Sequence, residues 1–134
     1  MIRKASLNDC IMLGQLNKHL IEDGKHPNTM DIDQLIDRMK HFINSEYTCY
    51  IYSLSDNIIA YCLFYGNSDF YYIRQLFVHR IHRKKGIATE LLNWLFINTW
   101  VDKKVRLDVL ANNHSAIEFY EKYGFKVDCL RMEK

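Results

Sequence analysis

The sequence lacks the features that mark membrane, secreted or metal-binding proteins. No apolar run approaches the ~18 residues that a membrane-spanning helix needs, and the charged start at residues 1–4 has no signal-type apolar core behind it. The cysteines are scattered without a Cys-x-x-Cys pair, so we interpret them as reduced thiols packed as small apolar groups. The histidines show no metal-ligand spacing, and we expect no metal. Together these absences favour a cytoplasmic protein.

The charge balance is too even to indicate a nucleic-acid partner. The formal net charge is +2 over 134 residues, whereas binding to a phosphate backbone needs a strong basic excess. Charged residues make up 25% and apolar residues 49%, as in ordinary globular chains. A chain of this length can bury one core and is too short for two, so we expect a single domain over residues 1–134.

Hydrophobic periodicity predicts one alternating α/β unit without linkers or repeats. Ser6 can cap a helix that ends near Asp23-Gly24, and Asp31 or Asp33 can start a second one with a clear apolar stripe. In chain order we expect a strand at 2–5, these two helices, strands at 48–54 and 58–65 joined by a turn at 55–57, a strand at 70–78, a helix after Gly86, a strand at 105–110, a helix at 113–123 and a terminal strand from Phe125 onward.

The segment from Leu76 to Ala88 carries the first chemical signal. An apolar strand enters a short basic turn, and Gly86 then leads into an apolar-periodic helix. A helix N-terminus presents unpaired N–H groups and partial positive charge, and a glycine lets the backbone approach a phosphate closely because it has no Cβ. Arg83, Lys84 and Lys85 add positive charge for a diphosphate. Alone, the pattern Arg-x-x-Gly-x-Ala also fits a solvated basic turn that caps a helix.

A second motif, Asn-x-x-Ala-Ile-x-Phe-Tyr-x-x-x-Gly-Phe, occupies residues 113–125, after the strand expected at 105–110. In this order and at this separation, the two motifs resemble the acyl-CoA-binding half of the GNAT N-acetyltransferase superfamily. The resemblance is strong over residues 70–128 and only architectural before them. It implies the GNAT-like mixed α/β fold, with a mostly antiparallel twisted sheet that is splayed between its fourth and fifth strands, and about four helices.

The resemblance also implies an activity, the transfer of an acetyl group from acetyl-CoA to a primary amine by direct attack in a ternary complex. Tyr120 matches the tyrosine that protonates the leaving thiolate, although an aromatic core residue of the last helix is the alternative interpretation. Asn113 matches an asparagine that caps this helix and contacts the cofactor. The resemblance assigns the remaining cofactor contacts to the backbone amides of Leu76, Phe77 and Val78, for the pantetheine arm and acyl carbonyl, and to residues Arg83, Lys84, Lys85, Gly86, Ile87 and Ala88, for the diphosphate.

The general base is less well defined. Family members often place a carboxylate or histidine in the fourth strand, where this chain offers Tyr72 and Arg74. Asp108 aligns with a glutamate that serves as base in ribosomal-protein-acetylating relatives. An ordinary exposed strand residue and a chain of waters are the alternatives.

The acceptor is predicted only by local charge. Glu22 and Asp23 lie in the region that shapes the acceptor pocket in such folds and could complement a cationic small-molecule or peptide amine, although a solvated helix end gives the same pattern. Acetylation of aminoacyl-tRNA would need a strong basic face, which the sequence lacks. The alternative function is a catalytically weak CoA-binding sensor or interaction module of the same fold, and the oligomeric state, monomer or homodimer, stays open.

Overall fold

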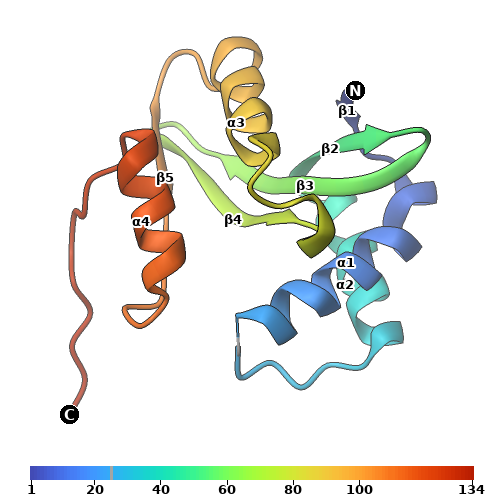
Figure 1. Cartoon of the computed structure of the whole chain (residues 1–134), viewed down its shortest axis with the longest axis horizontal. Helices are drawn as coiled ribbons and strands as arrows, with labels where there is room; N and C mark the ends of the chain where they lie inside the picture. Colours follow the sequence, from blue (N-terminus) through green and yellow to red (C-terminus); the bar gives the residue numbers. More distant parts are fainter. Residues whose placement is uncertain (25) are drawn as a thin grey trace.

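The computed structural model describes residues 1–24 and 26–134, which fold around one five-stranded sheet (Figure 1). The strands lie in chain order across the sheet: β1 (Ile2–Lys4), β2 (Thr48–Leu54), β3 (Asn57–Gly66), β4 (Phe70–Val78) and β5 (Lys104–Leu107). The pairs from β1 to β4 are antiparallel, and β5 runs parallel to β4. The sheet is therefore mixed and mostly antiparallel, as predicted.

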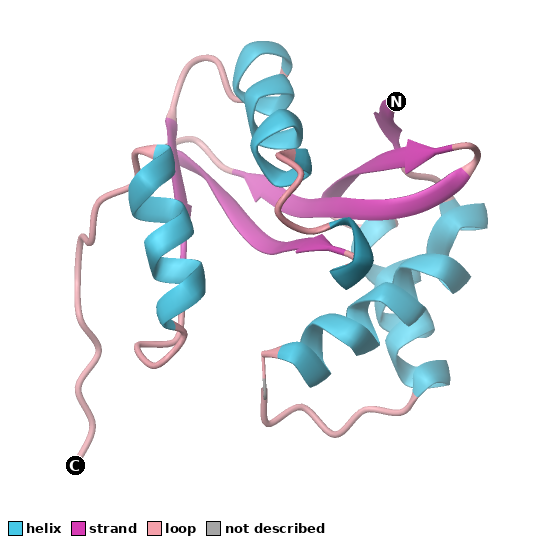
Figure 2. Ribbon diagram, in the orientation of Figure 1, coloured by secondary structure: helices cyan, strands magenta, loops and turns pink. Residues whose placement is uncertain are grey.

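Helices cover both faces of the sheet (Figure 2). α1 (Cys10–Asp23) and α2 (Ile32–Ile43) pack on one face, while α3 (Ile87–Asn98) and α4 (His114–Tyr123) pack on the other. Two short 3-10 helices, η1 (Leu7–Asp9) and η2 (Arg80–His82), lead into α1 and out of β4. No helix of the described residues is long and apolar enough to cross a membrane.

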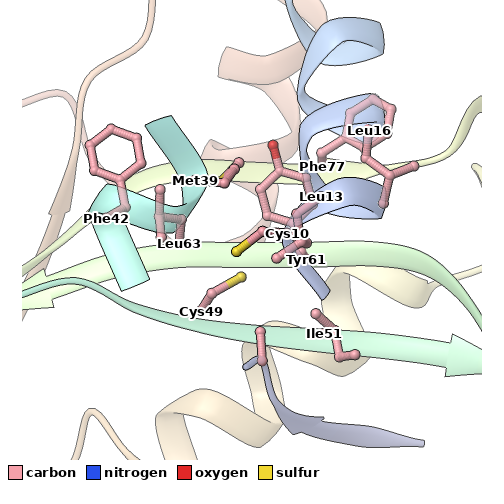
Figure 3. Packing of buried hydrophobic residues seen from close by; sticks show 11 residues of the cluster. Cys10, Leu13, Leu16, Met39, Phe42, Cys49, Ile51, Tyr61, Leu63 and Phe77 are labelled. Atoms are coloured by element: carbon pink, nitrogen blue, oxygen red, sulfur yellow. The ribbon is translucent and has the colours of Figure 1, made fainter. Parts of the chain in front are cut away.

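The core under α1 and α2 depends on close helix packing. A Cβ on Gly14 would lie 2.5 Å from Cγ1 of Ile36, so the glycine permits α1 and α2 to approach each other. Leu13, Met39 and Tyr61 are fully buried between these helices and the sheet (Figure 3). The apolar stripe predicted for α2 thus faces the core, and its capping box is formed by Asp31 with Gln34.

The connection between β2 and β3 is the predicted hairpin. Ser55 and Asp56 form its two-residue turn, with φ angles of 48° and 67°. Positive φ at both central residues gives the turn a twist that matches the flanking strands. This hairpin brings the second and third strands into register at the centre of the sheet.

The C-terminal segment differs from the prediction, since residues 125–134 form no strand. The N–H of Phe125 donates to the carbonyl of Tyr120 (2.9 Å), and that of Gly124 donates to Glu121 (3.1 Å), which together close the end of α4. The amide of Phe125 is therefore already used, and its ring packs on Tyr120 rather than on a neighbouring strand. The rest of the segment extends away from β5 in Figure 1. The strand predicted at 105–110 is also shorter, so Asp108 follows β5 instead of lying within it.

Candidate active site

The edge of β4 is open over its C-terminal half. Pairing with β5 begins at Phe70 with Lys104 and ends at Ile73 with Leu107. Immediately after this point β4 carries one extra residue, because Phe64 pairs with Ile73 whereas Leu63 pairs with Gln75. Arg74 is thus the residue of a β-bulge, which bends the strand and ends the pairing. The predicted splay between the fourth and fifth strands is confirmed by this register.

The direction of the backbone amides decides which groups face the open edge. The N–H of His79 donates to the carbonyl of Ile59 on β3 (2.8 Å). Because N–H groups alternate in direction along a strand, the amide of Phe77 also faces β3, while those of Leu76 and Val78 face away from it. The Val78 carbonyl accepts from Nε of Arg83 (2.9 Å) on this open side, which agrees with the alternation. Of the three predicted amides, only those of Leu76 and Val78 therefore point into the splay.

The basic turn after β4 contains two residues with a left-handed backbone conformation and ends at the start of α3. Lys84 and Gly86 have φ angles of 61° and 78°. No side chain of residues 1–24 and 26–134 caps α3, and its first internal hydrogen bond runs from Glu90 N–H to the Gly86 carbonyl (2.9 Å). The amides of Ile87, Ala88 and Thr89 thus have no partner within the helix. They form a positive, uncapped helix end of the kind that binds phosphate.

Arg83 differs from its two lysine neighbours, because the structure uses it to anchor the turn. Its amide closes η2 on the carbonyl of Arg80 (3.4 Å), and its guanidinium lies over the ring of Phe77 at 5.4 Å from the centroid. The guanidinium also forms an ion pair with Asp23 at the end of α1. Lys84 and Lys85 are exposed and carry the charge that is available to a diphosphate.

Tyr120 lies near the C-terminal end of α4. Its ring packs edge-on against Phe119 (5.3 Å) and Phe125 (5.5 Å), and the residue is half-buried. Burial raises the pKa of the Tyr120 phenol, and the electrostatic effect of the Cys62 thiol adds to the rise. Cys62 pairs with Leu76, one of the two residues whose amides face the splay. At neutral pH the group is a protonated donor.

Asn113 caps α4, as its sequence position predicts. Its side-chain oxygen accepts from the amide of Ala116 (3.3 Å) and from the hydroxyl of Ser115 (3.4 Å). Capping alone thus accounts for an asparagine at this position. The contact with the cofactor stays a prediction.

Asp108 follows β5 on the face of the sheet that carries α1 and α2. It is exposed, and it accepts a hydrogen bond from the Tyr72 hydroxyl on β4 (2.8 Å). Burial of the phenol and this hydrogen bond to the Asp108 carboxylate raise the pKa of Tyr72 to about 12. The partnership of Tyr72 was not predicted. It depends on the pairing of Tyr72 with Arg106, a register that no local sequence signal specifies.

The two acidic residues predicted at the acceptor site have separate surroundings. Asp23 forms ion pairs with both Arg80 and Arg83, so its charge is compensated by the basic turn. Glu22 lines a small surface pocket of about 240 Å³ between the end of α1, residues 28–30 and α2. The acceptor contact of this pair stays a prediction, and Asp23 can contribute only by giving up its arginine partners.

No cluster of three or more His, Cys, Asp and Glu side chains suited to a metal ion occurs in the part of the chain that the structure describes.

Comparison with known proteins places this arrangement in a family context. The structure superposes on a possible acetyltransferase from Clostridium difficile 630 with a TM-score of 0.85 and 21% identity, covering 100% of this chain and 95% of that one. A predicted acetyltransferase with acetyl-CoA from Clostridium acetobutylicum gives 0.75 and 21%, with 100% and 94% covered. A ribosomal-protein-alanine N-acetyltransferase from Brucella melitensis biovar Abortus 2308 gives 0.76 and 16%, with 100% and 97% covered.

These structural likenesses show the fold. No curated protein matches the chain in sequence. The model of the Acetyltransferase (GNAT) family matches residues 15–125, which include the open edge of β4, the basic turn and α4. The chain therefore belongs to the GNAT acetyltransferase family.

Proposed function

We propose that this protein transfers an acetyl group from acetyl-CoA to a primary amine. The observation that supports this most strongly is the uncapped start of α3. It follows a basic turn in which two residues have a left-handed backbone conformation, and it lies next to the open edge of β4. Three amides without helical partners and two exposed lysines suit a diphosphate, which is the most highly charged part of CoA. The donor set of the chain thus fits this cosubstrate.

The open edge supplies the groups for the acyl end. We assign the amides of Leu76 and Val78 to the pantetheine arm and the acyl carbonyl, because both face away from β3. Fixed N–H donors favour charge that develops on a carbonyl oxygen, since they need no reorganisation during the reaction. The ring of Phe77 is 3% exposed and packs in the core between the sheet and the helices α1 and α2.

Tyr120 and Asp108 have complementary roles in proton management. The amine nitrogen forms a bond to the acyl carbon, the carbon–sulfur bond breaks, and the amine loses one proton. Asp108, or a water held by it, accepts this proton. The Tyr120 hydroxyl donates a hydrogen bond to the departing sulfur. A phenol is already a weaker acid than a thiol, and burial raises the pKa of Tyr120 further, so stabilisation of negative charge on sulfur is its main contribution.

The diphosphate assignment is tested at Gly86 by two substitutions. A Cβ at this position meets no atom within 4 Å, so a side chain fits the protein itself. The φ of 78° disfavours most residues but is tolerated by asparagine, so Gly86→Asn should unfold at nearly the parental temperature while Gly86→Ala loses about 1 kcal/mol. Both side chains crowd the space in front of the helix start. We expect the dissociation constant of CoA, measured by calorimetry, to rise at least tenfold in both variants.

The outcomes separate the alternatives. Unchanged CoA affinity in a folded Gly86→Asn variant would contradict the diphosphate site. Tight binding of acetyl-CoA by the unmodified protein, without acetylation of any amine in a broad panel, would instead favour a CoA-binding sensor or interaction module.

A further inference from the structure

Two arginine side chains converge on one aromatic ring beside the open edge of β4. The guanidinium carbon of Arg74, the bulge residue, lies 5.0 Å from the centroid of the Phe42 ring. That of Arg38, from α2, lies 5.5 Å from the same centroid. The pair belongs to the face that carries α1 and α2, where Asp108 also lies. Two like charges that contact one ring repel each other unless an anion compensates them.

Neither guanidinium has an acidic partner among the described residues, and no ion pair joins them to any Asp or Glu of residues 1–24 and 26–134. Arg38 donates to the side-chain oxygen of Asn17 (2.9 Å), and the hydrogen bond found for Arg74 among the described residues is a long one to the Tyr47 hydroxyl (3.5 Å). Burial, followed by repulsion from Arg74, lowers the pKa of Arg38. A half-buried cation held by one neutral oxygen is costly, and an anionic ligand would offset that cost.

Two buried hydrogen-bond donors also lack an acceptor next to these arginines. Nε of Arg38 and Nδ2 of Asn17 are both inaccessible to solvent, and neither has a hydrogen-bond partner among the described residues. Asn17 itself is only 1% exposed. Unsatisfied buried donors are rare in folded proteins and each costs about 1–3 kcal/mol. The cluster of Arg38, Arg74 and Asn17 therefore has an excess of donors and positive charge, and a deficit of acceptors.

A continuous polar and aromatic surface links this arginine cluster to Asp108. Arg74 contacts Tyr47, whose ring lies 5.2 Å from that of Tyr65. The Tyr65 ring lies 5.4 Å from that of Tyr72, and Tyr72 donates to Asp108 (2.8 Å). One end of the surface thus carries a carboxylate suited to an ammonium group, and the other end carries two guanidinium groups. The charge pattern is that of a ligand with both an amine and an anion.

We propose that the amine acceptor of this protein carries an anionic oxygen group, a carboxylate or a phosphate, which binds Arg38 and Arg74. The inference rests on the proposed function, and it names the class of acceptor. Guanidinium groups suit both anions because their N–H donors match pairs of oxygen atoms. Arg74 is the specificity-determining residue of this site, and Arg38 is held in place by Asn17.

Matched acceptor pairs test the proposal. 6-Aminohexanoic acid is compared with 6-aminohexanamide for the carboxylate, and 6-aminohexyl phosphate with 6-aminohexanol for the phosphate. The flexible chain lets the amine and the anion reach opposite ends of the surface, and it keeps the intrinsic reactivity of the amine nearly the same in both members of a pair. We expect the anionic member of at least one pair to have a kcat/KM at least tenfold higher. We also expect Arg74→Gln to abolish this preference by raising only the KM of the anionic acceptor.

Lys103→Gln is the matched control. Lys103 also places a cation over an aromatic ring, 4.9 Å from the centroid of Tyr71, but its ring partner belongs to the core on the opposite face. The control removes the same charge and should change neither acceptor. The KM of acetyl-CoA should stay the same in both variants, because the diphosphate contacts lie at the start of α3.

Binding of the four acceptors to the CoA-loaded protein, measured by calorimetry, gives a second readout that does not depend on turnover. Weaker binding of the anionic member in Arg74→Gln, with unchanged binding in Lys103→Gln, supports the site. Equal or better binding of the neutral members to the unmodified protein overturns it, as does failure of all four to bind. Acetylation confined to neutral amines would leave the transferase function intact while this inference fails. Anion-dependent binding without any turnover would support the anion site and contradict the transferase function.

Discussion

Tyr120 and Tyr123 lie three residues apart on α4, and their hydroxyl groups have different surroundings. The Tyr123 hydroxyl donates to the side chain of Asn93 (2.7 Å), whereas no such bond is found for the Tyr120 hydroxyl within the described residues. Both rings pack against Phe125. Replacing each tyrosine with phenylalanine keeps the ring and removes only the oxygen. The pair can therefore separate catalysis from stability within a single helix.

The expected magnitudes follow from these contacts. A hydrogen bond to a charged group contributes about 1.5–3 kcal/mol, so losing the Tyr120 donor to the departing sulfur should lower kcat roughly 10- to 150-fold. Stability should hardly change, because the folded protein loses no bond. Tyr123→Phe should cost about 1 kcal/mol of unfolding free energy, since Asn93 loses its donor, and should leave kcat within about twofold.

The assay combines release of the CoA thiol, followed spectrophotometrically, with thermal unfolding of both variants. Because burial raises the pKa of Tyr120, its phenol stays protonated below pH ~10, and the rate ratio between the parent and Tyr120→Phe should be constant from about pH 7 to 9. Near-parental turnover in Tyr120→Phe would leave this residue as part of the core. An equal loss of turnover in Tyr123→Phe would show that the packing of α4, and not the hydrogen bond from Tyr120, limits the rate.

Two further predictions concern carboxylates at opposite edges of the sheet, next to β5 and β1. Asp108→Asn should depress the rate and remove the acidic limb of the pH–rate profile, and a profile identical to the parent's would assign the proton to another acceptor. The same substitution should lower the pKa of Tyr72 from about 12, because both the hydrogen bond and the charge of Asp108 raise it. Tyrosinate absorbance measures this change in pKa. Asp9 accepts from Arg3 (2.9 Å) and from the amide of Ser6 (2.8 Å), and the Arg3 hydrogen bond is the main cause that lowers the pKa of Asp9. The stabilisation from Asp9 is present above its unfolded pKa of about 3.9 and is lost as the pH falls through the lower pKa of the folded state. Asp9→Asn should therefore lower the unfolding free energy by about 1 kcal/mol at pH 7 and leave it unchanged near pH 2. An equal loss of unfolding free energy at both pH values would contradict the role of the ionised carboxylate.

The sequence predicted those elements whose signals are local. The stripe of α2, the Ser55-Asp56 turn and the glycine at the start of α3 each depend on residues a few positions apart. The terminal strand from Phe125 was wrong because apolar residues after a helix fit equally well a hydrophobic closure of that helix. The choice between them depends on whether an unpaired strand edge lies within reach, and only the tertiary structure specifies that.

The candidate site likewise has one part that local motifs mark and another that depends on the tertiary structure. Its proposed cofactor half consists of backbone groups at positions that two short motifs mark, so the sequence suffices to propose most of its residues. Sequence could not assign direction to the amides of Leu76, Phe77 and Val78, because direction follows from the pairing of His79 with Ile59. Nor could it show that Asp23 is paired with Arg83, 60 positions along the chain.

The acceptor half that we propose consists of side chains from separate elements, and its charge is the opposite of what local composition suggests. Acidic residues cluster in sequence around the end of α1, but Asp23 is neutralised there by Arg80 and Arg83. The uncompensated charge lies instead on Arg38 and Arg74, which are 36 positions apart and meet only because the bulge in β4 faces α2. A ligand responds to net charge after internal pairing, and not to the count of ionisable residues nearby. For this protein the distinction changes the expected acceptor from a simple cation to an amine that carries its own anion.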